Sequence, residues 1–192
     1  MAKLDPEAEK RERNKQIKWV TTIFLVTIVI SGTISFVSDE VMASSSLPVA
    51  FLILLVIILV GILFDIVGMA VASADEKPFH SMAAKKVPGA QEAIRLLRNA
   101  ERVSSICNDV VGDICGVVSG SASATIAAQV IRSFDFSWPQ VATLLMSALA
   151  AGLTVGGKAV GKSIAIDSCT EIVHTVGRVI HAMSQVLHGR KK

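Results

Sequence analysis

Residues 48–74 read PVAFLILLVIILVGILFDIVGMAVASA and contain a single charged residue, Asp65. The run exceeds the roughly 18–20 apolar residues that a helix needs to cross the hydrocarbon core of a bilayer. Residues 17–37, IKWVTTIFLVTIVISGTISFV, form a second such run, with Lys18 near its start. Both stretches predict transmembrane helices, and they set the fold class of the whole chain.

The composition points to further spans. The chain has 192 residues, of which 52% are hydrophobic and 5% aromatic, and its mean hydropathy is +0.58. Soluble domains rarely combine these values. Two weaker candidates, about 103–131 and 138–166, are rich in Gly, Ala and Ser and carry ionisable groups. We therefore predict an all-α, polytopic membrane protein with four transmembrane helices rather than a soluble helical bundle.

The first run has an alternative interpretation as a signal peptide, because basic residues precede it. It is longer than a signal-peptide apolar region of about 7–15 residues, and no convincing small-residue cleavage site follows it. We therefore interpret 17–37 as a membrane span that follows a basic tail over residues 1–16.

Basic residues are distributed unevenly among the segments that flank the four runs. The segment 38–47 has no Lys or Arg, and 132–138 has only Arg132. By the positive-inside rule, this pattern places both termini and the segment 75–102 in the cytoplasm, most simply at the plasma membrane. The basic residues on that side include Lys3, Lys10, Arg11, Arg13, Lys15, Lys18, Lys77, Lys85, Lys86, Arg95, Arg98 and Arg102, together with Arg190, Lys191 and Lys192 at the C-terminal end.

The third span is expected to have two different faces. At about 100° per residue, its polar and small residues fall within one arc of roughly 140°, while Val110, Val111 and Ile114 lie on the other side. In a bilayer the polar face must meet protein or water. That face consists of Ser105, Asn108, Asp109, Gly112, Asp113, Gly116, Ser119, Gly120 and Ser123.

Small residues also share a face on the second and fourth spans, and such faces let helices approach closely. On the second span they are Gly61, Asp65, Gly68 and Ala72, and on the fourth Ser147, Ala151, Thr154, Lys158, Gly161 and Lys162. Packing of the three faces would enclose Asp65, Asn108, Asp109 and Asp113, with Lys158 nearby.

Two interpretations of these charges remain open. In the structural one, Asp109 or Asp113 pairs with Lys158 or Lys162 and fixes the register of the helices. In the functional one, the carboxylates and the asparagine carbonyl line a path for a cation. Intramembrane ionisable residues favour the functional interpretation, and hard divalent cations prefer oxygen ligands.

Four segments follow one another in an informative order. A span ends in FDIVGMAVASADEKPFHSM, and the basic hairpin KKVPGAQEAIRLLRNAERVSS comes next. The polar span ICNDVVGDICGVVSGSASA then leads to a last span that closes with VGGKAVGKSIAIDSCTEIVHTVGRVI. This order resembles the transmembrane domain of the CorB/CorC and CNNM family of magnesium-transport proteins, over roughly residues 50–185.

The resemblance implies roles for particular residues. Asn108 matches the asparagine of the family's polar helix, so its side chain is expected to coordinate the ion. Gly157, Lys162 and Ser163 match the family's closing motif. The departures are Gly68 and Met69 where the family has Ser and Glu, Lys158 where it has Glu, and Gly161 where it has Pro. They remove one hydroxyl and two carboxylates, for which Asp65, Asp109 and Asp113 would compensate.

The resemblance also implies a homodimer, and it leaves 17–37 as an extra helix outside the family-like region, 48–185. The chain stops before any region comparable to the family's nucleotide-binding CBS pair. We therefore expect no nucleotide regulation within it, and any regulation would come from a cytoplasmic partner.

The cytoplasmic segments predict helices with scaffold roles. In the hairpin, Ile94, Leu96 and Leu97 are expected to bury against the bundle. Residues 167–188 form an amphipathic pattern that predicts a helix at the inner membrane surface or against a partner. Its histidines, His174, His181 and His188, are interpreted as polar-face residues rather than a zinc or pH-sensing site, since neighbours one heptad apart are about 10 Å apart on a helix.

No nucleophile–base pair, phosphate-binding loop or zinc spacing occurs, so no enzyme is predicted. Basic residues without aromatic partners give no expectation of nucleic-acid binding. The cysteines, Cys107, Cys115 and Cys169, are interpreted as small buried thiols.

The sequence thus predicts binding or transport of a divalent cation, Mg²⁺ with Co²⁺ or Mn²⁺ as substitutes. The expected ligands are Asn108, Asp109, Asp113 and Asp65, and the expected supporting residues are Ser105, Gly112, Gly116, Ser119, Gly68, Lys158 and Lys162. The alternative is a non-transporting scaffold or regulatory subunit in which the same residues form a closed Asp–Lys network.

Overall fold

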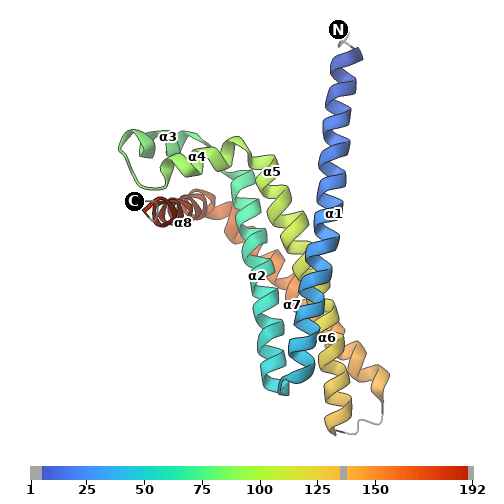
Figure 1. Cartoon of the computed structure of the whole chain (residues 1–192). Coiled ribbons are helices and arrows are strands. Elements are labelled where there is room, and N and C mark those ends of the chain that lie inside the picture. Colours follow the sequence, from blue (N-terminus) through green and yellow to red (C-terminus); the bar gives the residue numbers. More distant parts are fainter. Residues whose placement is uncertain (1–5, 135–137, 190–192) are drawn as a thin grey trace.

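The computed structural model describes residues 6–134 and 138–189, which form helices joined by short links (Figure 1). Within these ranges the prediction of an all-α protein with four helices of transmembrane length and apolarity is confirmed. The four are α1 (Pro6–Ser44), α2 (Leu47–Ser73), the continuous rod of α5 (Ala100–Ser105), η1 (Ile106–Gly112) and α6 (Asp113–Phe134), and α7 (Pro139–Asp167).

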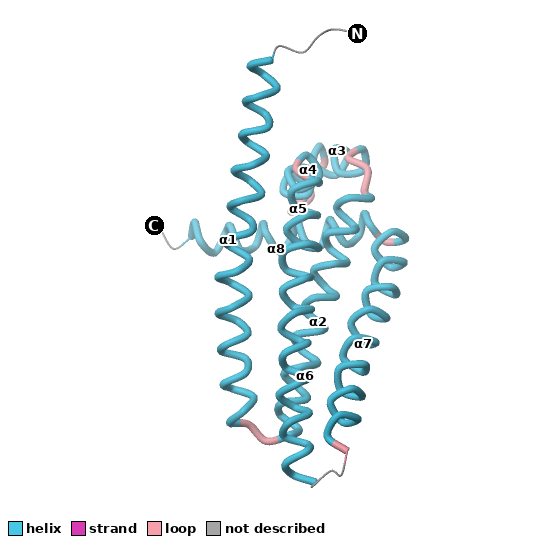
Figure 2. Tube along the Cα trace, turned by 90° about the vertical axis from the view of Figure 1, so that its right-hand side faces the viewer, coloured by secondary structure: helices cyan, strands magenta, loops and turns pink. Residues whose placement is uncertain are grey.

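Helix α1 starts at Pro6, so most of the segment expected as a tail belongs to the same helix as the first span. Its N-terminal part extends well beyond the other helices (Figures 1 and 2). Near its C-terminal end α1 is attached to α6, where Met42 is fully buried and the Gln129 side-chain amide donates to the Met42 carbonyl oxygen at 2.6 Å. Farther toward the N-terminus of α1, the Arg102 guanidinium of α5 lies over the Trp19 ring, 5.7 Å from its centroid.

Replacing Gln129 with leucine is expected to lower the free energy of unfolding by about 0.5–1.5 kcal/mol, because one buried hydrogen bond is lost while the Met42 carbonyl oxygen keeps the Ser45 N–H as a donor at 3.1 Å. Thermal unfolding in detergent measures this loss. Gln140→Leu, at an exposed position on α7, is the control and should change stability by less than about 0.5 kcal/mol. An equal loss in both variants would contradict the assigned role of the buried bond.

Two apolar clusters form the core, one toward each end of α2. One gathers around Leu54 and Ile58 of α2 and includes Met42, Ala50, Ala122 and Ile126. The other gathers around Ala70 and Val71 and includes Phe79, Ala93, Leu97, Ala165 and Val173. Asp65 lies between them on α2. The charged residues of the bundle therefore occupy a zone between two apolar layers.

The hairpin consists of α3 (Lys77–Ala84) and α4 (Ala90–Arg98), and it lies at the same end of the bundle as α8 (Cys169–Gly189) and the start of α1 (Figure 2). As predicted, Leu97 is buried, with Ile94 and Leu96 packed against the same cluster. Helix α8 runs across the bundle axis and packs on α4 and α2.

The junction of α4 and α8 needs two glycines. Gly89 has φ +84°, which favours glycine, and a Cβ there would overlap the backbone of Arg178. A Cβ on Gly177 would likewise overlap the Gly89 carbonyl oxygen. The two helices therefore meet backbone to backbone.

His181 of α8 does not project into solvent as a polar-face residue; its Nδ1 lies 2.9 Å from Oε1 of Glu92 on α4. This hydrogen bond lowers the pKa of the Glu92 carboxyl. His174 has a buried Nε2 with no hydrogen-bond partner in the described residues. The side chain of His188 lies outside those described.

The Glu92–His181 contact predicts an acid-sensitive junction. A depressed carboxyl pKa contributes stability that is present above the unfolded-state value of about 4.3 and is lost as the pH falls through the folded-state value. Amide hydrogen exchange of α8, corrected for intrinsic pH effects, should therefore show protection at neutral pH and its loss in acid. Glu92→Gln should remove that dependence on acid, and a variant with the full wild-type dependence would refute it.

Candidate cation site between α2, α6 and α7

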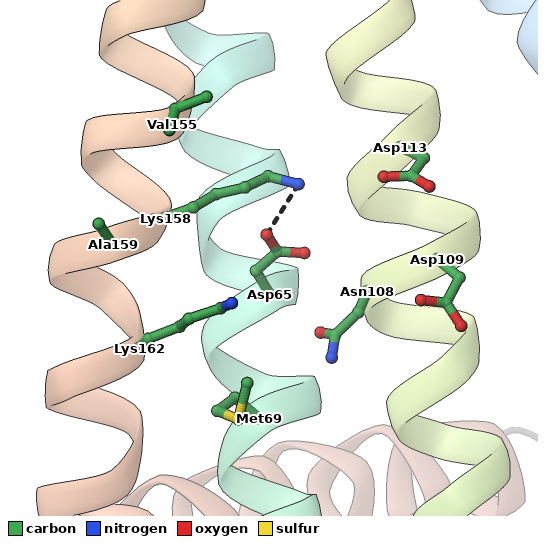
Figure 3. Close-up of a pocket in the computed structure, with 9 residues that line it drawn as sticks. All are labelled: Asp65, Met69, Asn108, Asp109, Asp113, Val155, Lys158, Ala159 and Lys162. Atoms are coloured by element: carbon green, nitrogen blue, oxygen red, sulfur yellow. Dashed lines mark ion pairs between the residues drawn. The ribbon is translucent and has the colours of Figure 1, made fainter.

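Three membrane-length rods bring the predicted site residues to one cavity of about 490 Å³. Asp65 comes from α2, Asn108 and Asp109 from η1, Asp113 from the start of α6, and Lys158 and Lys162 from α7 (Figure 3). Met69, Val155 and Ala159 complete the lining. All four predicted ligands and both predicted lysines therefore border the same space.

Asp65 is the one buried charged side chain in the described part of the chain. Its Oδ2 lies 2.8 Å from Nζ of Lys158, and the two side chains are 11% and 24% exposed. Its Oδ1 is buried and has no hydrogen-bond partner among the described residues. Lys158 thus compensates one oxygen of the carboxylate and leaves the other uncompensated.

The carboxamide of Asn108 has the same kind of imbalance. Its Nδ2 donates to the Ser104 hydroxyl at 3.2 Å, whereas its Oδ1 is buried without a partner in the described residues. Figure 3 shows the Asn108 side chain directed from η1 toward α2, where Asp65 lies. Two residues that line the cavity therefore each hold a buried oxygen acceptor with unused lone pairs.

Two glycines create the space for these acceptors. A Cβ at Gly68 would overlap Oδ1 and Cγ of Asn108, and a Cβ at Gly112 would overlap Oδ1 of Asp65. Each glycine lies on the helix opposite the side chain that it accommodates. Gly157 and Gly161 of α7 receive side chains of Ile62 and Ile66 of α2, which brings Lys158 close to Asp65.

Asp109 and Asp113 also line the cavity, but on its solvent-exposed side, and both residues are exposed. Asp109 Oδ2 accepts a hydrogen bond from the Ser105 hydroxyl at 2.8 Å. Across the described residues, no three His, Cys, Asp or Glu side chains group closely enough to hold a metal ion. The four predicted ligands form an inner pair, Asp65 and Asn108, and an outer pair, Asp109 and Asp113.

The remaining supporting residues divide between the cavity and the packing. Lys162 borders the cavity and is exposed. Gly116 has nothing within 4 Å of an added Cβ, so no neighbour requires glycine there. Ser119 is buried, but its hydroxyl donates to the Gly116 carbonyl of its own helix at 2.9 Å.

The single inward polar face expected for the third span is not observed. Gly112, Ser119 and Ser123 are buried, whereas Asp109, Asp113 and Gly120 are exposed. At uniform 100° steps the buried members and the exposed members occupy two adjacent halves of the predicted arc. The neighbouring helices therefore cover only one half of the polar face. The π-helical segment η1, in which hydrogen bonds span five residues instead of four, lies within this rod.

Lys158 pairs with Asp65, whereas the structural interpretation expected Asp109 or Asp113 as its partner. Sequence reasoning also did not identify Ser104 as the acceptor for the Asn108 side-chain amide, although its position four residues earlier on the helix gives that geometry. The described cysteines are free thiols, and Cys107 is buried as expected.

Comparisons with protein-family models, curated proteins and solved structures find no match for this chain.

Proposed function

We propose that this membrane protein binds a partly hydrated divalent cation at Asp65 and Asn108 and moves it across the bilayer. The observation that supports this is a pair of buried oxygens without a hydrogen-bond partner in the described residues, Asp65 Oδ1 and Asn108 Oδ1, on two side chains that line one cavity. Carboxylate and amide oxygens are the ligands that hard cations prefer, and Mg²⁺ keeps several waters and needs only one or two carboxylates. We propose Mg²⁺ as the ion, with Co²⁺ or Mn²⁺ as substitutes.

Lys158 and the outer carboxylates have distinct roles in this proposal. The Lys158 ammonium neutralises Asp65 when no cation is bound, and an arriving cation displaces it from Oδ2. Asp109 and Asp113 raise the local cation concentration at the outer side of the cavity, because clustered like charges attract counter-ions. They contact the ion through water.

The chain is proposed to act as a distant relative of the CorB/CorC family at the plasma membrane, with both termini and the hairpin in the cytoplasm. The exposed carboxylates of Asp109 and Asp113 need a polar environment beyond this chain's own helices, because charged groups on a membrane span face protein or water rather than lipid. A homodimer is the proposed source of that environment, and a cytoplasmic partner is the proposed regulator.

The Asp65–Lys158 ion pair favours a second candidate function, a non-transporting scaffold or regulatory subunit. In that case the pair is permanent and sets the register of α2 against α7. The two candidates differ in what Mg²⁺ does. A cation-binding protein gains stability with Mg²⁺, by about 2.7 kcal/mol at a concentration one hundred times the dissociation constant, and a scaffold gains none.

The experiment measures Mg²⁺ entry into proteoliposomes with an internal fluorescent indicator, together with the thermal shift that Mg²⁺ causes. The inner variant Asn108→Ala and the outer variant Asp109→Asn/Asp113→Asn are compared with Glu101→Gln, an exposed acidic residue on the same rod. We expect Asn108→Ala to weaken Mg²⁺ binding by at least about tenfold, because loss of a residue that only supports a metal ligand already costs about that much. The outer variant should slow entry, and Glu101→Gln should behave as the wild type.

Flux that stays unchanged in both site variants while they remain folded would refute transport through this cavity. A Mg²⁺ thermal shift that is absent from the wild type would favour the scaffold. In that case the charge exchange Asp65→Lys/Lys158→Asp should restore stability relative to either single change.

A further inference from the structure

The exposed side of α8 is the apolar surface outside the four rods that the cation proposal leaves unexplained. Val179, Met183 and Val186 are 54%, 60% and 71% exposed, and Ile180 is partly exposed beside them. At about 100° per residue, Val179, Met183 and Val186 lie within about 60° of one another. They form a continuous apolar strip on the C-terminal half of the helix.

The strip faces away from the hairpin. Gly177 contacts Gly89 of the hairpin, and on the same helical geometry it lies about 120–180° from the three strip residues. Val173 and His181, which flank Gly177 on the wheel, are also turned toward α2 and α4 through burial and the Glu92 hydrogen bond. The hairpin therefore covers one side of α8 and leaves the strip uncovered.

The position of α8 identifies what lies against the strip. Helix α7 ends at Asp167 and α8 begins at Cys169, so α8 starts where a membrane-length rod stops. Because α8 then runs across the bundle axis, its whole length stays near that level (Figures 1 and 2). The last turns of α7 before this junction expose Val160, Ile164 and Ile166, so apolar surface continues from the span onto α8.

Charge supports the same environment. Arg178 is exposed on α8. Three more basic residues, Arg190, Lys191 and Lys192, directly follow the end of α8 in the sequence. Basic residues beside an apolar helix face are attracted to anionic lipid headgroups, and this combination is typical of helices that lie in the membrane interface.

We propose that α8 lies in the plane of the membrane interface, with Val179, Met183 and Val186 inserted among the lipid acyl chains. The hairpin covers the opposite side of the helix. In this arrangement α8 fixes the depth of α7, and hence of Lys158, relative to the bilayer. The proposal does not depend on cation transport.

The test is a nitroxide scan of residues 175–186 in the full chain, with Cys107, Cys115 and Cys169 replaced by alanine. The protein is reconstituted in phosphatidylcholine vesicles that contain phosphatidylglycerol. Accessibility to oxygen, which concentrates in lipid, is compared with accessibility to a water-soluble nickel chelate. We expect oxygen maxima at 179, 183 and 186 and nickel maxima at 178 and 185, which lie about 80–160° from the strip residues.

Three other patterns would overturn the proposal. Nickel accessibility at every position would place α8 in water. Labels at 183 that neither reagent reaches would place the strip against protein, and dipolar broadening between such labels would identify that protein as a second copy. Each can occur whether or not the vesicles take up Mg²⁺.

A second measurement keeps the native cysteines. Met183→Asp/Val186→Asp should lift α8 from the lipid and speed tryptic cleavage after Arg178 in proteoliposomes, whereas Gln185→Asp, at an exposed position about 100–160° from the strip residues, should not. Equal cleavage rates in the two variants would also overturn the proposal.

Discussion

Asp65→Ala is expected to lower the free energy of unfolding by about 3–5 kcal/mol, because it leaves Lys158 as an uncompensated charge inside the bundle. The effect is large because Asp65 is the counter-ion that the structure places at hydrogen-bonding distance from that ammonium group. The same substitution should abolish the Mg²⁺ thermal shift, since it removes the charged ligand of the inner pair. Denaturant or thermal unfolding in detergent, with and without Mg²⁺, measures both effects.

The double variant Asp65→Ala/Lys158→Met separates the two effects. Removing both charges should recover most of the stability, because apolar replacements for a buried ion pair are often neutral. The Mg²⁺ shift should stay absent. Asp109→Ala is the matched single control; its carboxylate is exposed, and its loss should cost less than about 0.5 kcal/mol. If Asp109→Ala costs as much as Asp65→Ala, the outer pair is part of the buried network and this account of the site is wrong.

Gly68→Ala is expected to reduce Mg²⁺ affinity by at least about tenfold and to cost about 1–3 kcal/mol of stability. The added methyl group would occupy the volume of the Asn108 carboxamide and would also press on Cβ of Cys107. Asn108 must then rotate or η1 must move away from α2, and in either case Oδ1 leaves its buried position against Gly68. Titration of the Mg²⁺ thermal shift gives the affinity, and unfolding without Mg²⁺ gives the stability.

The control for this change is Gly116→Ala on the neighbouring helix. No atom lies within 4 Å of a Cβ at Gly116, so the substitution should leave both quantities nearly unchanged. Wild-type Mg²⁺ affinity in Gly68→Ala would show that the position of Asn108 is not important for binding. Loss of affinity in Gly116→Ala as well would indicate that helix packing in general, rather than the Gly68–Asn108 fit, controls the site.

The fold could be predicted because the mean hydropathy of a long apolar run changes little when any single residue changes. The run at 48–74 is several residues longer than a span needs and the run at 17–37 is just long enough, and both are apolar almost throughout, so their helices are insensitive to any one residue. The inward face of α2 could also be predicted, since that helix is regular: Gly61, Asp65 and Gly68 are all buried. Ala72, the fourth member of that face, is exposed, because at that end of α2 the hairpin and α8 pack on Ala70 and Val71 instead.

The partner of Lys158 could not be predicted, because two pieces of information are absent from periodicity. One is which half of the polar arc of the third span the neighbouring helices cover: they bury Gly112 and leave Asp109 and Asp113 exposed. The other is the depth to which Gly157 and Gly161 let α7 approach α2. That approach sets the distance from Lys158 to Asp65, and it depends on the fit of Ile62 and Ile66 rather than on charge.

An apolar cluster packs on α2 on either side of Asp65, so this helix is held in place near both of its ends. Movement of α2 along its own axis would break contacts in both clusters at once. On the proposed function, α2 therefore stays in place when an ion enters, and the only movement that the site needs is rotation of the Lys158 side chain away from Asp65.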